Sequence, residues 1–144
     1  MNYIDKIKSR EELKASIDQS RSDGKTVVLC HGCFDILHPG HVRHLAWAKR
    51  QGDLLAVTVS GDDVIQKGAS RPFVPQNLRA ENLAALEVVD HVSIDSGEWA
   101  GPILDFVRPD IYVKGKEFES VYSGRFGNER KLVADYGGQV RFSS

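Results

Sequence analysis

The sequence has no long hydrophobic run and almost no excess charge of either sign. Its apolar stretches fall short of the roughly 20 residues that cross a bilayer, and the N-terminus, Met-Asn-Tyr-Ile-Asp-Lys, lacks the apolar core of a secretory signal. The 19 basic and 20 acidic residues give a net charge of −1, which gives no sign of a surface for nucleic acid or for an anionic membrane. We therefore expect a cytoplasmic protein that binds neither.

Cysteine is scarce, and the two thiols, Cys30 and Cys33, are two residues apart. Such a C-x-x-C pair occurs in redox sites and in one half of many zinc sites. No second C-x-x-C follows, and no histidines follow at zinc spacing. The pattern favours packing of Cys30 at a strand end, with a redox or zinc site as the alternatives, and we expect no metal site made by the protein itself.

Low-complexity linkers and internal repeats are also absent, and 144 residues suffice for one domain that buries most of its unfolded surface. The tetrapeptide that starts at Ser9 is a capping box, and Leu13 and Ile17 lie four residues apart. Residues 1–24 are thus predicted to form an N-terminal helical extension. We predict a single domain over residues 1–144, with a fragment of a longer protein as the alternative.

Short apolar runs alternate with helical patterns along the rest of the chain, which is typical of an α/β fold. With right-handed crossovers, the pattern predicts one Rossmann-like, doubly wound domain, whose parallel five-stranded sheet has the order 3-2-1-4-5 and carries helices on both faces. The glycine-rich segment 121–128 is predicted to be a mobile lid. The predicted strands are 26–30, 54–59, 90–94, 110–113 and 139–142, and the predicted helices after the first are 39–50, 64–67, 77–88, 102–107 and 129–136.

The first crossover carries the most informative pattern. A β-branched strand is followed by Gly32-Cys33-Phe34-Asp35 and then by His38-Pro39-Gly40-His41, where the helix is predicted to begin. Proline suits the first turn of a helix, and glycine allows a ligand to approach the backbone. Because a helix start presents free N–H groups to an anion, two imidazoles there predict a phosphate site.

Together, these two segments resemble the G-x-F-D and H-x-G-H signatures of the cytidylyltransferase-like nucleotidyltransferases. Over residues 25–140, the chain is similar to the adenylyltransferase module of bacterial heptose-1-phosphate enzymes. In that module, a Gly-Asp pair stands where this chain has Lys116-Glu117. Because of this difference, the resemblance does not decide the base or the sugar, and either ATP or CTP is the expected nucleotide donor.

The resemblance implies three sets of site residues. The expected catalytic residues are His38 and His41, which would bind the α- and β-phosphates, and Lys67, which would neutralise the leaving pyrophosphate. The expected nucleotide-binding residues are Gly32, Cys33, Phe34, Asp35, Gly40, Arg79, Lys114 and Gly115. The candidates for the acceptor are Asp62, Asp63, Arg71 and His44; the position of the two aspartates at the carboxyl edge of the sheet suits an acceptor or a metal-bound water, and burial is the alternative for His44. The residues alone leave other roles open. One of Asp62 and Asp63 is expected to be only a helix cap, a surface position is an equal alternative for Arg79, and an Asx-type turn that holds the loop is the alternative for Asp35.

The reaction implied is attack by a phosphate oxygen of a sugar 1-phosphate on the α-phosphorus of a nucleoside triphosphate, with release of pyrophosphate. Mg²⁺ is expected through the phosphates, and the expected partners are a second copy of the chain and a fused or separate kinase domain. One alternative is a CTP-dependent enzyme that acts on glycerol phosphate, an aminoalkyl phosphate or a phosphonate. Another is a module that binds a nucleotide without turnover.

Overall fold

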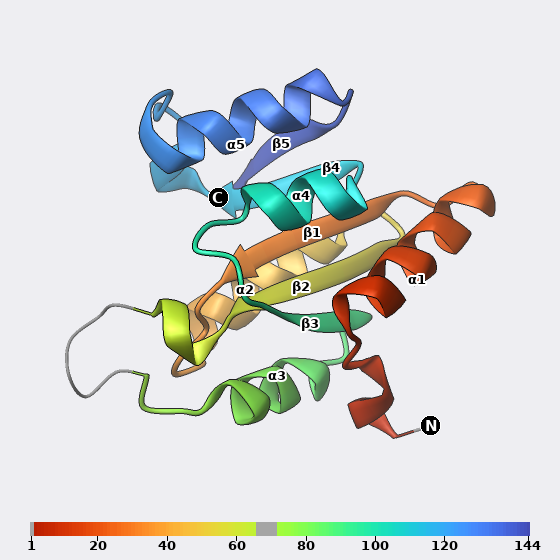
Figure 1. Ribbon diagram of the computed structural model, residues 1–144, viewed down its shortest axis with the longest axis vertical. Coiled ribbons are helices and arrows are strands. Elements are labelled where there is room, and N and C mark those ends of the chain that lie inside the picture. Colours follow the sequence, from red (N-terminus) through yellow and green to blue (C-terminus); the bar gives the residue numbers. More distant parts are fainter. Residues whose placement is uncertain (1, 66–71) are drawn as a thin grey trace.

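The computed structural model describes residues 2–65 and 72–144, which form one parallel sheet covered by helices on both faces (Figure 1). The order of the strands is β3-β2-β1-β4-β5, and every neighbouring pair is parallel. The predicted fold is therefore confirmed. The strands are β1 Val27–Gly32, β2 Leu54–Ser60, β3 His91–Asp95, β4 Ile111–Gly115 and β5 Gln139–Ser143.

Two apolar clusters, one on each face of the sheet, hold the layers together. Helices α2 and α3 contribute Leu45 and Leu83 to one cluster, and α1 and α4 contribute Leu13 and Leu104 to the other. Each of these four leucines is fully buried. None of the helices in the described ranges is long and apolar enough to span a membrane. The helices are α1 Arg10–Ser22, α2 Pro39–Lys49, α3 Gln76–Ala84, α4 Gly101–Val107 and α5 Gly124–Asp135, with 3-10 turns η1 Tyr3–Lys6, η2 Asp62–Val64 and η3 Lys116–Phe118.

The N-terminal residues pack against the rest of the domain. The Ser9 side chain accepts a hydrogen bond from the Glu12 backbone, and the Glu12 carboxylate accepts one from the Ser9 backbone, so α1 begins with the predicted capping box. Before this helix, Ile7 forms a parallel bridge with Val92 of β3. The extension expected at residues 1–24 thus lies against β3 and one face of the sheet.

Two predicted boundaries are wrong for identifiable reasons. Helix α3 ends at Ala84 rather than at residue 88, and the chain then turns toward β3. The predicted lid at 121–128 is half helix, because α5 begins at Gly124 and buries Phe126. Gly127 serves close packing, since a Cβ there would collide with the Tyr122 carbonyl group.

The site lies where β1 and β4 separate. These strands pair only at Val28↔Ile111 and Leu29↔Tyr112, whereas β1 pairs with β2 along its whole length. Chains that leave adjacent parallel strands in opposite directions open a crevice at the carboxyl edge of the sheet. The β1–α2 loop and the residues after β4 form its two walls.

Candidate active site

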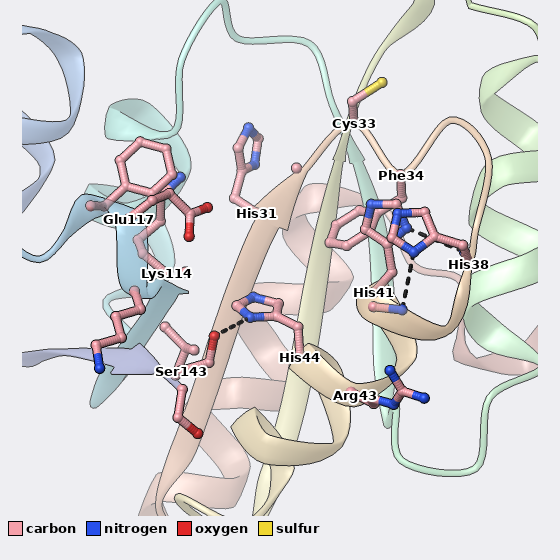
Figure 2. A pocket seen from close by; sticks show the side chains of 17 residues that line it. His31, Cys33, Phe34, His38, His41, Arg43, His44, Lys114, Glu117 and Ser143 are labelled. Atoms are coloured by element: carbon pink, nitrogen blue, oxygen red, sulfur yellow. Dashed lines mark hydrogen bonds between the residues drawn. The ribbon is translucent and has the colours of Figure 1, made fainter.

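A cleft of about 540 Å³ occupies this crevice (Figure 2). One wall is formed by the β1–α2 loop and the first turn of α2, and the other by the end of β4, η3 and the end of β5. Eight of the predicted nucleotide and catalytic residues line it together: Gly32, Cys33, Phe34, His38, Gly40, His41, Lys114 and Gly115. His44, expected near the acceptor, lies in the same cleft.

The β1–α2 loop holds an aromatic ring against one of the two histidines. Phe34 has a φ of 50° and only 8% of its surface is exposed. A Cβ on Gly32 would lie 3.0 Å from the Phe34 ring, so a glycine there lets the ring fold back over β1. The ring then meets His41 edge to face, with 5.8 Å between the centroids.

His38 and His41 form a reciprocal cap on α2. The His38 backbone is extended, and its ring Nδ1 accepts a hydrogen bond from the Gly40 N–H at 3.0 Å. The His41 Nδ1 accepts one in turn from the His38 N–H at 3.3 Å. In Figure 2 the two rings lie close together, and their centroids are 4.0 Å apart.

This cap determines which nitrogen of each ring carries the proton. An Nδ1 that accepts a hydrogen bond from the backbone holds no proton itself, so the neutral ring is protonated at Nε2. Each imidazole thus has an N–H donor on the side away from its own backbone. At the N-terminus of a helix, such donors add to the backbone N–H groups that favour anions.

Gly40 is required by the same arrangement. A Cβ at this position would lie 2.7 Å from Cε1 and 3.0 Å from Nδ1 of the His38 ring. The ring caps the helix only because residue 40 has no side chain. The glycine of the H-x-G-H pattern therefore positions a histidine.

In the opposite wall, the ammonium group of Lys114 packs over aromatic rings. The Lys114 Nζ lies 4.3 Å from the centroid of Phe118 and 5.6 Å from that of Phe126. Such contacts hold an ammonium group by its attraction to the ring faces. The lining of this wall also includes Lys116 and Glu117, so two ammonium groups and one carboxylate face the cleft, and the wall has a net positive charge.

Two further histidines between the walls are partly buried. The His31 Nδ1 lies 2.8 Å from the Thr58 hydroxyl, and burial, assisted by the Lys114 ammonium, lowers the pKa of His31 to about 4. The His44 Nδ1 lies 2.7 Å from the Ser143 hydroxyl on β5, and burial also lowers the pKa of His44. His31 is therefore neutral at pH 7 and adds no charge to the cleft.

Three predicted contacts are corrected by the structure. Arg79, expected at the nucleotide phosphates, is fully buried, and its guanidinium binds carbonyl groups and the Asp62 carboxylate. Asp62, expected near the acceptor, instead pairs with Arg79, and it also accepts a hydrogen bond from the Gln76 N–H. The buried Asp35 accepts hydrogen bonds from the Phe73 and Val74 N–H groups, so it supports the loop rather than lining the cleft.

Asp63 lies at a second cavity of about 520 Å³, on the far side of Cys33. Cys33 lines both cavities, and the second one also contains Ser60, Glu98 and Arg125. Lys67 and Arg71 fall outside the described residues.

The cysteines have different environments. Cys30 is buried, and burial raises the pKa of its thiol to about 12, which disfavours the thiolate required for redox chemistry or zinc. Cys33 is partly exposed and lines the cleft. In residues 2–65 and 72–144, no three His, Cys, Asp or Glu side chains are grouped to hold a metal ion.

Sequence reasoning missed several residues of the two cavities. Glu117, Phe118 and Ser143 line the first cavity, and Glu98 and Arg125 line the second. Ser143 and Glu98 were detectable in principle, because each lies at or just after the carboxyl end of a strand in a sheet whose order was predicted. Arg125 was hidden because its segment was interpreted as a lid.

Comparison with known proteins agrees with this geometry. The sequence model of the cytidylyltransferase-like family matches residues 29–138. The bifunctional protein HldE of Syntrophotalea carbinolica is 41% identical over 97% of this chain, and that of Alcanivorax borkumensis is 39% identical over 94%. In both cases, the chain spans about 28% of the relative's length.

Solved structures give the same result for the fold. A lipopolysaccharide core biosynthesis protein from Thermoplasma volcanium superimposes with a TM-score of 0.69 and 27% identity, over 84% of this chain and 98% of that protein. A pantoate-beta-alanine ligase from Francisella tularensis, complexed with beta-gamma ATP and beta-alanine, has a TM-score of 0.65. At 13% identity, with 95% of this chain and 66% of that one covered, the ligase shows a shared fold alone.

Proposed function

Because the chain belongs to the cytidylyltransferase-like family, we propose that it transfers a nucleoside monophosphate from ATP or CTP to the phosphate of a sugar 1-phosphate. The observation that supports the proposal is the reciprocal histidine cap at the N-terminus of α2 in an open cleft, from which we infer an Nε2–H donor on each ring. The resemblance of residues 25–140 to heptose-1-phosphate adenylyltransferases makes ATP and a heptose 1-phosphate the first pair to test.

The chemistry requires few groups from the protein. An oxygen of the acceptor phosphate forms a bond to the α-phosphorus, and the bond from that phosphorus to the oxygen of the departing pyrophosphate breaks. Since a phosphate monoester is ionised near neutral pH, no base is needed to remove a proton. The protein must instead position the two substrates in line and stabilise the charge on the phosphate oxygens.

Each wall of the cleft has a part in this proposal. His38 and His41 donate hydrogen bonds to the α- and β-phosphates, where charge develops as the bond breaks. Lys114 draws the nucleotide to the opposite wall, and Lys67 is proposed to neutralise the pyrophosphate. Gly32 and Gly40 let the phosphates approach the backbone.

The acceptor is proposed to lie in the second cavity, since in-line attack requires an approach from the side opposite to the leaving group. Cys33 separates this cavity from the first one, so the reacting phosphorus would lie beside this residue. Asp63 and Glu98 offer carboxylates to sugar hydroxyls, and Arg125 offers a cation to the acceptor phosphate. Mg²⁺ is expected to arrive with the triphosphate and to be held by phosphate oxygens.

The test is release of pyrophosphate with each of the four common ribonucleoside triphosphates and a panel of acceptors. The panel contains sugar 1-phosphates, glycerol 3-phosphate, phosphoethanolamine and a phosphonate. A double variant, His38→Asn with His41→Asn, is the matched control, because asparagine retains a short acceptor near the position of Nδ1 but has no donor at the position of Nε2. We expect turnover with ATP or CTP and a sugar 1-phosphate in the wild type, and none in the control.

Other outcomes would contradict the proposal in different ways. Turnover only with glycerol 3-phosphate, phosphoethanolamine or the phosphonate would replace the sugar as acceptor. Stabilisation by a nucleotide without pyrophosphate release would indicate a binding module. Equal turnover in the wild type and the control would remove the two histidines from the mechanism.

A further inference from the structure

Arg79 is a fully buried cation whose hydrogen bonds join three separate segments. Its Nε donates to the Val74 carbonyl at 2.8 Å, and its Nη1 donates to the carbonyls of Cys33 and Ser60 at 2.9 and 2.7 Å. The Nη2 donates to the Asp62 carboxylate at 2.7 Å. One side chain of α3 thus holds the β1–α2 loop, the end of β2 and the chain that leads into α3.

The position of these contacts in the sheet is informative. The ladder between β1 and β2 runs to its last pair, Gly32↔Val59. The residue after each member of this pair is Cys33, just beyond β1, and Ser60, the last residue of β2, and the same nitrogen of Arg79 binds the carbonyls of both. The guanidinium therefore continues the connection between the strands by one step, at the place where the two cavities meet.

We propose that Arg79 is a positioning residue, which sets the spacing between Cys33 and Ser60 and thereby the place of the histidine cap. This inference rests on the proposed function for its kinetic consequence. The loop is fixed to residues 73–74 twice, because Asp35 accepts the hydrogen bonds of two N–H groups there and Arg79 donates to the Val74 carbonyl. A shift of Cys33 is passed on to His41 through the next residue, Phe34, whose ring contacts the imidazole.

Only arginine provides this set of bonds. Its planar guanidinium has five donors in fixed directions, whereas lysine has one nitrogen that cannot reach acceptors on three sides. Replacement by lysine keeps the positive charge beside Asp62 but leaves some buried carbonyls without a donor. The substitution therefore separates positioning from charge.

The two cysteines report on the proposal without any need for catalysis. Cys33 is partly exposed in the β1–α2 loop and its carbonyl is bound by Arg79, while Cys30, three residues earlier on β1, is buried in the core. Loosening of the loop exposes only the thiol of Cys33. Global unfolding exposes both.

The experiment measures the alkylation rate of each cysteine with iodoacetamide in the wild type and in Arg79→Lys, by mass spectrometry of the full chain's peptides. We expect the rate at Cys33 to rise about threefold or more, and that at Cys30 to stay the same. Arg130→Lys is the control, because Arg130 also binds backbone carbonyls, of Glu119 and Val121, but on the other side of the cleft. An unchanged rate at Cys33, or a parallel rise at both thiols, would overturn the proposal.

Kinetics supply the second readout. Misplacement of catalytic groups by about 1 Å costs on the order of 10²-fold in rate. We expect kcat of Arg79→Lys to fall about 10- to 100-fold, with KM for the triphosphate changed much less. A change in KM alone would count against positioning, and a wild type without turnover would refute the proposed function while the thiol rates still decide the role of Arg79.

If Arg79→Lys does not fold, Asp62→Ala takes its place in the alkylation experiment. It removes the carboxylate that holds the guanidinium in place, so the Nη1 bonds to the Cys33 and Ser60 carbonyls are expected to loosen. A selective rise at Cys33 supports the proposal here as well. Equal rates in this variant and the wild type would contradict it.

Discussion

Replacement of His38 by three different residues separates its two roles. Its Nδ1 caps α2 through the Gly40 N–H, and its Nε2 is the proposed phosphate donor. Asparagine is among the best N-cap residues and has an oxygen near the position of Nδ1, but it has no group at the position of Nε2. Alanine removes both functions. Glutamine is a poor N-cap residue, but its longer side chain brings an amide N–H toward the position of Nε2.

The two roles have different magnitudes and appear in different measurements. Loss of an N-cap costs about 1 kcal/mol of stability, which lowers Tm by about 4 °C for a domain of this size. Loss of one donor to a developing oxyanion costs about 2.7–4 kcal/mol, or 10²- to 10³-fold in kcat. His38→Asn should therefore match the wild type in Tm and lose 10²- to 10³-fold in kcat, while His38→Ala should lose both.

The assays are thermal unfolding followed by circular dichroism and pyrophosphate release at saturating substrates. His38→Gln is expected to fall in Tm and to retain more activity than His38→Asn. Turnover of His38→Asn within about threefold of the wild type would refute the reasoning, because that difference is below 1 kcal/mol and too small for a lost transition-state donor.

Three further predictions follow from the walls of the cleft. Gly40→Ala should lower kcat at least about tenfold, because the new Cβ would lie 2.7 Å from the His38 ring; a wild-type kcat would show that the ring position is unimportant. Lys114→Met should raise KM for the triphosphate about tenfold, equivalent to about 1.4 kcal/mol, with little change in kcat, and an unchanged KM in steady-state kinetics would remove Lys114 from the binding site. The pKa of His31 falls from 6.5 in the unfolded chain to about 4 in the folded protein, so the unfolded state binds more protons between these values, and stability is lost as the pH falls from 6.5 toward 4. Urea unfolding should show that the free energy of unfolding falls by up to about 1.4 kcal/mol per pH unit from this one group, and His31→Gln should make that free energy depend less on pH. Parallel plots of unfolding free energy against pH for the two proteins would contradict the lowered pKa of His31.

The order of the strands and the location of the cleft could be predicted because they depend on local patterns. Alternation of apolar runs with helical segments identifies the elements, and the handedness of crossovers then leaves few topologies. The histidine pair was placed at the start of α2 for the same reason. Pro39 and Gly40 are signals of a helix start that act over a few residues.

The role of Arg79 could not be predicted, because its partners come from three distant parts of the sequence. An arginine near the start of an amphipathic helix has the same local signal whether it faces solvent or is buried. Only the folded chain brings the carbonyls of Cys33, Ser60 and Val74 around one guanidinium. The pairing of Asp62 with Arg79 could not be predicted for the same reason.

The segment that was predicted as a lid shows a different limit. Glycine-rich composition indicates a loop when each glycine is taken as a source of freedom. Here Gly124 takes a φ of 70° at the start of α5, and Gly127 allows close approach to the Tyr122 backbone. Both glycines therefore allow α5 to begin and pack where it does, and they are not evidence of a mobile loop.

Nitrogen-15 NMR of the histidine rings tests the central claim most directly, since it detects which ring nitrogen is protonated and whether a nucleotide contacts it. For His38 and His41, we predict the Nε2–H tautomer near pH 7.5. A non-hydrolysable triphosphate should shift their Nε2 resonances and leave those of His91, which lies on β3, unchanged. Protonation at Nδ1 in the free protein, or Nε2 signals that do not respond to a saturating nucleotide, would contradict the account.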